Sequence, residues 1–302
     1  MAPEQYRGRF APSPSGPLHF GSLITALASY LDAKAQGGEW WVRIDDLDPL
    51  RVAPGASDAI LRALEAYGLT WDGAVQYQHQ RSEAYTLALA ELQRQGVVYA
   101  CACSRREIAD SSIGRPSAPI YPGTCRAGLA PGKVARALRV DTRGENVAFE
   151  DRLQGPVSLD LEREVGDFIL QRADGLFTYQ LAAVVDDAEL GITDIVRGAD
   201  LLDSTLRQLY LQYLLKLPLP RYLHLPVAVN ALGEKLSKQT LAPPLDITHP
   251  QPVLVRALHF LNHSLPQALH GAATQEILAW AVQNWSITPI PAVRSKEPEE
   301  GL

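Results

Sequence analysis

Hydrophobic positions near the start of the chain alternate between strand-like runs and helical spacing. The apolar residues from Leu23 to Leu31 fall on one face of a helix that we expect to begin at Gly21 and to end at Gly37-Gly38. The runs "QYRGRFAP" before this helix and "EWWVRID" after it are typical of strands. Strand, helix and strand in this order predict a βαβ unit, hence a parallel sheet whose ligands bind at the carboxyl ends of its strands.

The same patterns extend through the rest of the sequence. Further helices are expected in "SDAILRALEAYG", "RSEAYTLALAELQRQG", "DSTLRQLYLQYLLKL", "PVLVRALHFLN" and "ATQEILAWAVQNW". We expect Asp203 or Ser204 to cap the third of these. The segment "RADGLFTYQLAAVVDD" is interpreted as a β-hairpin that turns at Asp174-Gly175, and "VRSKEPEEGL" as a frayed tail.

These elements predict an α/β fold of the Rossmann type with additions. We expect residues 1–97 to form the first half of a nucleotide-binding domain, and residues 98–130 to form a Gly-, Pro- and Ser-rich insert without regular structure. Residues 131–245 would form the second half, and residues 246–302 a small helical piece with the tail.

Composition changes this picture little. With 302 residues, 46% of them hydrophobic, the chain can bury a full core. No apolar run is long enough for a membrane helix, and "MAPEQYRGRF" lacks the apolar core of a secretion signal, so we expect a cytoplasmic protein. A net charge of -6 argues against coating of nucleic acid, but it leaves room for a local basic groove.

Three cysteines, Cys101, Cys103 and Cys125, fall within one short stretch. An odd number of thiols in a reducing compartment favours metal binding over a disulfide. Three thiolates suit zinc, which takes four ligands, and the segment contains no histidine to complete the set. A structural zinc site is therefore expected, and three inert reduced thiols are the alternative.

The turn "PSPSGPLHFGS" joins the first strand to the first helix. Gly16 and Gly21 allow the backbone to approach a ligand closely, and the helix that opens at Gly21-Ser22 presents free N–H groups to phosphate. His19 stands between the glycines, where it can donate to an anionic phosphate as charge builds in a transition state. On its own, such a turn is more often structural than functional.

A second short motif is "KLSKQ", from Lys235 to Gln239, which follows an apolar run and a turn. Lysine is a mobile point charge that can follow a departing phosphate. Lys235 and Lys238 are spaced three apart, although solvated lysine pairs are common.

Together, the two motifs resemble the paired signatures of class I aminoacyl-tRNA synthetases. The segment His19-Phe20-Gly21-Ser22 is similar to the HIGH motif, with Ser22 in place of its second histidine, and "KLSKQ" is similar to KMSKS. The resemblance extends through "RIDDLDPLR", "DGLFTYQLAAVVDD" and "DIVRGADLL" to the catalytic domain of glutamyl-tRNA synthetases, over about residues 5–245. It implies ATP, carried with Mg²⁺, as a substrate, with His19 and Lys238 as the catalytic residues. The ATP-binding set implied is Gly16, His19, Gly21, Ser22, Lys235, Ser237 and Lys238.

For L-glutamate, the resemblance implies arginines for the carboxylates and acceptors for the ammonium group. The implied set is Arg9, Phe10, Ala11, Pro12, Ser13, Asp45, Tyr179 and Arg197. Asp45 stands where the family has glutamate, so its carboxylate is one methylene shorter. Asp45, Asp46 and Asp48 alternatively form a carboxylate cluster that could bind magnesium. For the metal site, the resemblance implies Tyr121 as the fourth ligand, with water as the competitor.

About sixty residues follow the "KLSKQ" loop, too few for an anticodon-binding domain, so the chain is most similar to a stand-alone, truncated paralogue. This resemblance implies transfer of glutamate to queuosine at the wobble position of tRNA(Asp), whose anticodon loop the catalytic pocket would receive, by a monomer. One alternative is a short glutamyl-tRNA synthetase that charges the 3′ end of tRNA(Glu). Another is a non-catalytic, zinc-stabilised tRNA-binding protein. A dinucleotide oxidoreductase is disfavoured because no G-x-G-x-x-G follows the first strand.

Overall fold

A parallel sheet forms the centre of the molecule. The computed structural model describes residues 5–111, 120–236 and 243–298, with the side chains of residues 109–111 excepted. The sheet, in spatial order, consists of β10 (Arg221–Leu225), β9 (Asp194–Gly198), β1 (Arg7–Phe10), β2 (Glu39–Ile44) and β3 (Gln76–Tyr77). Every neighbouring pair is parallel, which confirms the predicted α/β fold.

The first βαβ unit forms as its pattern predicts. Helix α1 (Phe20–Ala35) connects β1 to β2, and it buries its apolar face against the sheet. Gly37 adopts a positive φ of 63°, and a Cβ atom on Gly38 would stand 2.4 Å from the carbonyl oxygen of Tyr6. Glycine is thus required at this turn, because any side chain would collide with the strand that must lie beside it.

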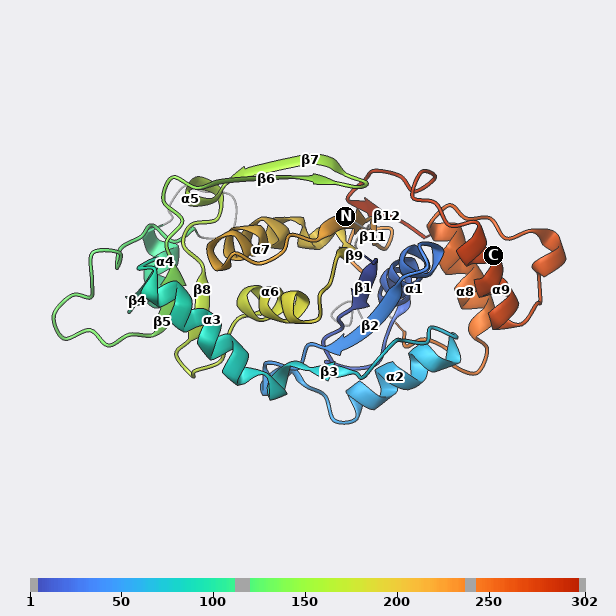
Figure 1. The fold of residues 1–302 in the computed structure, drawn as a ribbon, viewed down its shortest axis with the longest axis horizontal. Helices are drawn as coiled ribbons and strands as arrows, with labels where there is room; N and C mark the ends of the chain where they lie inside the picture. The colour runs from blue at the N-terminus through green and yellow to red at the C-terminus, as the bar shows by residue number, and fades with distance from the viewer. Residues whose placement is uncertain (1–4, 112–119, 237–242, 299–302) are drawn as a thin grey trace.

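The other predicted helices are present. Helices α2 (Ala56–Ala66) and α3 (Ser82–Arg94) follow β2, and α8 (Pro250–Phe260) and α9 (Thr274–Gln283) pack on α1 at one end of the molecule (Figure 1). Helices α2, α8 and α9 contribute buried side chains to one large apolar core around the sheet. Helix α3 contributes to a second core, which it shares with the helices at the other end of the molecule.

The second region contains antiparallel strands. Strands β4 (Val98–Cys101), β5 (Ala137–Val140) and β8 (Ile169–Arg172) form one sheet, and β6 (Asn146–Asp151) pairs with β7 (Gly155–Asp160) as a hairpin that runs along the edge of the molecule in Figure 1. Helix α5 (Leu161–Glu164) follows β7. The expectation that residues 98–130 lack regular structure is wrong, because they contain β4 and helix α4 (Arg105–Ser111).

The predicted hairpin at "RADGLFTYQLAAVVDD" is also wrong in its second half. The turn at Asp174-Gly175 exists, with Gly175 at a φ of 82°, and the chain then enters helix α6 (Tyr179–Glu189). β-branched and aromatic residues favour strands locally. Here the helix places Leu181, Val184 and Val185 in the second core. It also pairs two aspartates with the buried Arg43 and the partly exposed Arg81, so tertiary contacts override the local preference.

Two predicted element ends also differ. Helix α7 (Leu202–Leu215) begins before the expected caps, so Asp203 and Ser204 lie in its first turn, directly after a single 3₁₀ turn. The predicted frayed tail includes β12 (Ser295–Lys296), which pairs in parallel with β11 (Val227–Ala228). An isolated short strand has no pattern of its own, and its partner here lies far earlier in the sequence.

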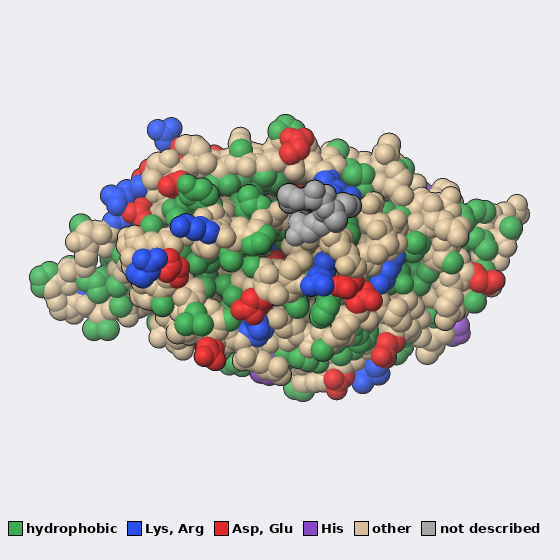
Figure 2. Space-filling view, in the orientation of Figure 1, with side chains coloured by type: hydrophobic (Ala, Val, Ile, Leu, Met, Phe, Trp, Pro, Cys, Tyr) green, Lys and Arg blue, Asp and Glu red, His purple; other side chains and the backbone are tan. Residues whose placement is uncertain are grey.

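The surface shows no dominant charge on the face in Figure 2, where basic and acidic side chains are interspersed. Within the described ranges, none of the helices has the length and apolar character needed to cross a membrane.

Candidate active site

His19 caps the helix that follows β1. Its backbone is extended, with φ -122° and ψ 175°, and its Nδ1 atom accepts a hydrogen bond from the Ser22 N–H at 3.3 Å. Because Nδ1 is an acceptor, the neutral ring carries its proton on Nε2. Gly16, earlier in the same turn, has a φ of 147° that other residues rarely adopt. The turn therefore fixes the histidine beside the N-terminus of α1, where a phosphate is favoured.

The segments on either side of the second motif lie beside this turn. Leu245 N donates to Leu18 O at 3.0 Å, and His19 forms a bridge with Pro244. On the other side of the motif, Lys235 Nζ lies 2.6 Å from Asp200 Oδ2, just after β9. Ser237 and Lys238, which we expect to bind ATP, lie outside the described residues, as does Gln239. The structure thus brings both flanks of "KLSKQ" to the carboxyl edge of the sheet.

Arg9, on β1, takes part in a buried network of ion pairs. Its Nε and Nη2 atoms donate to the two carboxylate oxygens of Asp187 at 3.1 and 3.2 Å. Arg43, on β2, donates to Asp187 Oδ1 at 2.6 Å and to Asp45 Oδ1 at 2.6 Å. The chain Arg9–Asp187–Arg43–Asp45 is buried throughout, so the geometry of each member depends on its neighbours.

The Asp45 carboxylate therefore already forms an ion pair with Arg43 in the ligand-free protein. Burial, together with the nearby carboxylates Asp186 and Asp187, raises the pKa of Asp45 to about 6 against the opposing effect of Arg43. Asp46 and Asp48 have separate partners, His79 and Arg172. Each of the three carboxylates thus pairs with a different side chain. These contacts give no support to the alternative of a magnesium site formed by all three.

Arg197, on β9, is 3% exposed and has only neutral hydrogen-bond partners among the described residues. Its Nη2 atom donates to Thr205 Oγ1 and to Gln208 Oε1, both at 2.7 Å. Its Nε atom donates to His224 Nε2 at 3.1 Å, and its Nη1 atom to Tyr179 Oη at 3.2 Å. A buried guanidinium without a carboxylate is costly, and an anionic ligand would compensate it.

A cavity of about 210 Å³ collects several of the predicted glutamate-binding residues. Ser13, Asp45 and Tyr179 line it together. Phe10 instead stacks on Trp40, with ring centroids 6.3 Å apart, so its side chain belongs to the core. Pro12 contributes its carbonyl oxygen, which accepts the Asp45 N–H at 3.0 Å, while Ala11 lies between them, partly exposed.

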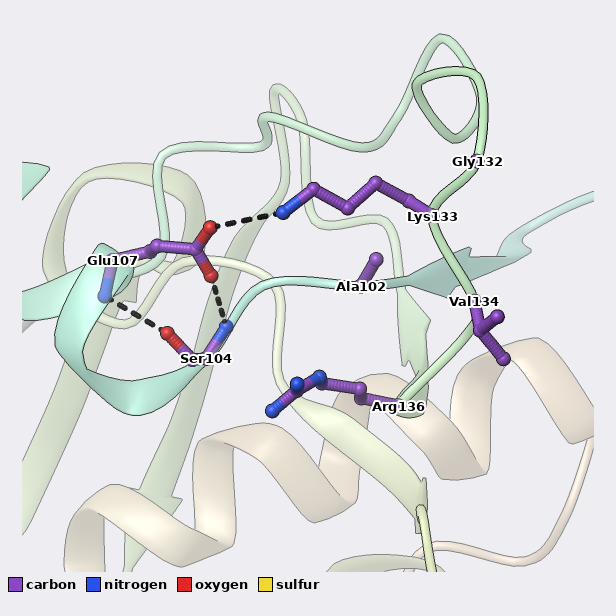
Figure 3. A pocket seen from close by; sticks show the side chains of 7 residues that line it. All are labelled: Ala102, Ser104, Glu107, Gly132, Lys133, Val134 and Arg136. Carbon is purple, nitrogen blue, oxygen red and sulfur yellow. Dashed lines mark hydrogen bonds and ion pairs between the residues drawn. The ribbon is translucent and has the colours of Figure 1, made fainter.

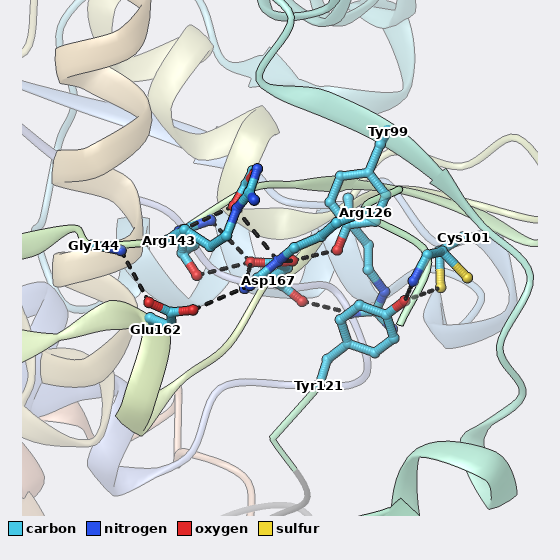
Figure 4. Close-up of polar contacts among 12 residues, drawn as sticks. Tyr99, Cys101, Tyr121, Arg126, Arg143, Gly144, Glu162 and Asp167 are labelled. Carbon is cyan, nitrogen blue, oxygen red and sulfur yellow. Dashed lines mark hydrogen bonds and ion pairs between the residues drawn. The ribbon is translucent and has the colours of Figure 1, made fainter. Parts of the chain in front are cut away.

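The three cysteines converge, as the sequence predicts. Their sulfur atoms all lie within 4.8 Å of one another, and those of Cys103 and Cys125 are 3.6 Å apart. The Tyr121 hydroxyl lies 3.4 Å from Cys101 Sγ (Figure 4). It also lies 3.8 Å from Cys103 Sγ and accepts the Cys125 N–H at 2.9 Å. Three sulfurs and one oxygen around a common point fit a tetrahedral zinc ion.

Asp167 anchors this cysteine segment to the rest of the fold. Arg126 donates to it through Nε at 2.6 Å and Nη2 at 2.8 Å, Thr142 donates through its N–H and hydroxyl, and the Tyr99 hydroxyl also contacts it (Figure 4). On the other side of the segment, a cavity of about 450 Å³ is bordered by an exposed Glu107–Lys133 ion pair (Figure 3). None of the predicted glutamate-binding residues lines that cavity.

Several site residues are not evident from the sequence motifs. Three residues, Arg43, Asp187 and His224, hold the predicted site residues in place. None of the three is among the ATP-binding or glutamate-binding residues that the resemblance implies. One signal was available: Arg43 sits inside the buried strand "EWWVRID", and Asp186-Asp187 follows an apolar run. Charged residues in buried elements must have partners.

The parallel sheet, the capped turn and the converging second motif define a class I tRNA synthetase. Consistently, the family model "tRNA synthetases class I (E and Q), catalytic domain" matches residues 5–249. Glutamyl-Q tRNA(Asp) synthetase of Aromatoleum aromaticum is 54% identical over 95% of this chain and 90% of that protein, and that of Dechloromonas aromatica is 56% identical over 95% and 96%. The chain belongs to the glutamyl-Q tRNA(Asp) synthetase family.

A solved structure agrees on the fold. The glutamate-tRNA synthetase from Elizabethkingia anophelis, 24% identical, superposes with a TM-score of 0.79 over 98% of this chain and 68% of that chain. The family model and the curated relatives confirm the resemblance that the motifs indicate.

Proposed function

We propose that this chain activates L-glutamate with ATP and transfers the glutamyl group to the queuosine at the wobble position of tRNA(Asp). The observation that carries the choice of amino acid is Arg197, a buried cation at the carboxyl edge of the sheet with neutral partners only in the described chain. The side-chain carboxylate of glutamate would supply the missing negative charge. The relatives' shared name supports the acceptor.

The first step joins glutamate to AMP. An oxygen of the α-carboxylate attacks the α-phosphorus of ATP, a carboxyl–phosphorus bond forms, the bond from that phosphorus to the bridging oxygen breaks, and pyrophosphate leaves. No protein nucleophile is required, so the protein contributes position and charge. His19 would donate from Nε2 to the phosphate, and Lys238 would stabilise the departing charge. Mg²⁺ would arrive with ATP.

The second step transfers the glutamyl group. A hydroxyl of the queuosine cyclopentenediol attacks the activated carbonyl carbon, the bond from that carbon to the phosphate oxygen breaks, and AMP leaves with the hydroxyl proton. The modified base must be unstacked to reach the pocket.

The remaining glutamate contacts follow from the cavity. Asp45 and the Tyr179 hydroxyl would accept the ammonium group, because both line the cavity and both offer oxygen acceptors. Arg9 uses Nε and Nη2 for Asp187, so Nη1 is the atom through which it would meet a ligand carboxylate. The backbone of Ala11 and Pro12 and the hydroxyl of Ser13 would complete the wall.

We also propose a structural zinc ion held by Cys101, Cys103, Cys125 and Tyr121. When bound, zinc would cross-link β4 to the loop that contains Tyr121 and Cys125. Burial raises the pKa of the Cys103 thiol to about 11, so the free site holds at least this sulfur in its protonated form. A bound cation favours the thiolate instead. Because all four ligands come from the protein, the ion would have no open position for substrate.

An acceptor assay tests the function directly. Purified protein receives ATP, labelled glutamate and one tRNA at a time. We expect label on queuosine-containing tRNA(Asp) and none on the queuosine-free form. Label on tRNA(Glu) would instead support a short glutamyl-tRNA synthetase, and the absence of glutamate-dependent pyrophosphate exchange would leave a non-catalytic tRNA-binding protein.

An Arg197→Gln variant tests the amino acid site. Loss of a charge-assisted hydrogen bond costs about 1.5–3 kcal/mol, so the KM for glutamate should rise roughly 10- to 150-fold while the KM for ATP stays unchanged. Arg62→Gln, which removes an exposed arginine on α2, is the matched control. Equal effects of both variants would contradict the assignment.

A further inference from the structure

His224, on β10, lies fully buried between a carboxylate and the Arg197 guanidinium. Its Nδ1 atom is 2.6 Å from Asp151 Oδ2, and its Nε2 atom is 3.1 Å from Arg197 Nε. The strands place these groups together, because His224 pairs with Arg197 in the β10–β9 register and Asp151 ends β6. The three side chains thus form a row, and Tyr179, which accepts a hydrogen bond from Arg197 Nη1, lines the 210 Å³ cavity.

The row defines the tautomer of the histidine. Burial acts to raise the pKa of Asp151, but hydrogen bonds from the His224 ring and from the backbone N–H groups of Gln154 and Leu153 hold it below its usual value. An ionised carboxylate only accepts, so Nδ1 carries the ring proton. Nε2 is then an acceptor, as Arg197 Nε–H requires.

The other states of the ring do not fit. The Thr205 hydroxyl, 2.9 Å from Nε2, can pair with either form of that atom. A proton on Nε2, however, would face the N–H of Arg197 and would leave Nδ1 as an acceptor against the Asp151 carboxylate. A doubly protonated ring would place a second cation beside the guanidinium. Burial lowers the pKa of His224, with the charge of Arg197 acting in the same direction, so the ring stays neutral despite its contact with Asp151. Only the Nδ1–H form satisfies every group in the row.

The remaining partners of Arg197 fix its orientation. Thr205 and Gln208 hold Nη2, and His224 holds Nε, so Nη1 is directed to Tyr179, which lines the 210 Å³ cavity. A carboxylate in direct contact would neutralise the guanidinium. The structure instead interposes a neutral imidazole, which orients the cation and leaves its charge available.

We propose that Asp151 and His224 are positioning residues that aim Arg197 at the ligand carboxylate and so set the preference for glutamate over glutamine. This inference rests on the proposed function, because it takes glutamate as the ligand of Arg197. Neither residue contacts the substrate in this scheme. Both act through the guanidinium.

Asp151→Asn is the most direct test. Oδ1 of Asp151 accepts the N–H groups of Leu153 at 3.0 Å, Gln154 at 2.9 Å and His224 at 3.2 Å, so a carboxamide would keep its oxygen there and turn its NH₂ towards the ring. The NH₂ group would force the ring proton onto Nε2, against Arg197. We expect a tenfold or larger rise in the KM for glutamate, a smaller glutamate-to-glutamine ratio of kcat/KM, and an unchanged KM for ATP.

Two further measurements separate positioning from stability. Nitrogen-15 NMR of the substrate-free protein should show His224 as the Nδ1–H tautomer, and as the Nε2–H tautomer in Asp151→Asn. His224→Gln, which can present a carboxamide oxygen to Arg197, should retain more glutamate discrimination than His224→Leu. Glu150→Gln, an exposed neighbour on β6, is the matched control and should change nothing.

An Nε2–H tautomer in the unmodified protein would overturn the positioning role, as would variants in which glutamine discrimination is unchanged or the KM values for glutamate and ATP rise together. If the unmodified protein shows no glutamate-dependent pyrophosphate exchange, the proposed function fails first and the inference fails with it. The tautomer measurement distinguishes these cases, because it needs no activity.

Discussion

The carbonyl oxygen of Leu236 lies 3.2 Å from the point at which a Cβ atom on Gly21 would stand. The same Cβ would be 3.3 Å from the His19 ring. The two signature motifs, far apart in the sequence, thus contact each other through a position where only hydrogen fits comfortably. This contact explains the glycine better than the close approach of a ligand that the sequence alone suggested.

Gly21→Ala should separate stability from activity. Alanine favours a helix over glycine by about 1 kcal/mol, so α1 should not lose stability. The added methyl group must displace Leu236 or the His19 ring by a few tenths of an ångström, and we expect the KM for ATP to rise several-fold. Pyrophosphate exchange and thermal unfolding measure the two effects. An unchanged KM for ATP would show that the loop adapts without consequence.

Glutamate binding should weaken at mildly acidic pH. Asp45 must be ionised to accept the ammonium group, and its pKa in the ligand-free protein is raised to about 6, primarily by burial. Above pH 6 the carboxylate predominates, and below it the apparent affinity for glutamate should fall towards tenfold per pH unit. Asp45→Asn should bind weakly at every pH and lose this dependence. A wild-type profile that is flat from pH 7 to pH 5 would contradict the role of Asp45.

Metal removal should destabilise the cysteine segment. Elemental analysis is expected to find about one zinc per chain, and a chelator should lower the thermal unfolding temperature. Cys103→Ser should lose the metal and show the same lower temperature without chelator. Thr124→Ala, which changes an exposed neighbour of Cys125, should behave like the unmodified protein. Full zinc content in Cys103→Ser would rule out that ligand set. Tyr121→Phe then tells whether the phenol or water completes the site.

The ion pair between Arg126 and Asp167 should matter for folding. Asp167 is fully buried, and burial alone would raise its pKa, but hydrogen bonds from Arg126, Tyr99 and Thr142 lower it. Arg126→Ala would leave this carboxylate without its cation, at a cost of about 3–5 kcal/mol in unfolding free energy. Arg143→Ala, which removes an exposed partner of Asp141, should leave the unfolding free energy almost unchanged because solvent screens this ion pair. Similar losses in urea unfolding would contradict this assignment.

Sequence patterns found the parts of the fold that depend on local periodicity. The strand at "QYRGRFAP", the helix after Gly21 and the late helices each follow from the spacing of apolar residues. Helix α6 was missed because "FTYQLAAVVDD" is rich in strand-forming residues, and its helical state depends on distant groups: Arg43 pairs with Asp187, and Arg81 with Asp186. The local spacing of apolar residues gives no indication of such distant contacts.

The sequence predicted only those parts of the candidate site that belong to recognisable motifs. The convergence of the three cysteines was predictable because an odd cluster of thiols favours a metal site. The flanks of "KLSKQ" meet the His19 turn because both lie at the carboxyl edge of the sheet. The tautomer of His224 and the pairing of Arg9 with Asp187 are set by strand register and helix placement, which arise only on folding.

The pairing of β11 with β12 bears on how the protein is made. The short strand β11 leads into the "KLSKQ" turn. At one edge, the N–H groups of Val227 and Val229 donate to the carbonyl oxygens of Arg294 and Lys296. On the ribosome, therefore, the nucleotide-binding turn can be built early, but the base of its partner loop has to wait for this late segment. A nascent polypeptide would lack the β11–β12 hydrogen bonds at this edge until residues 294–296 have been synthesised.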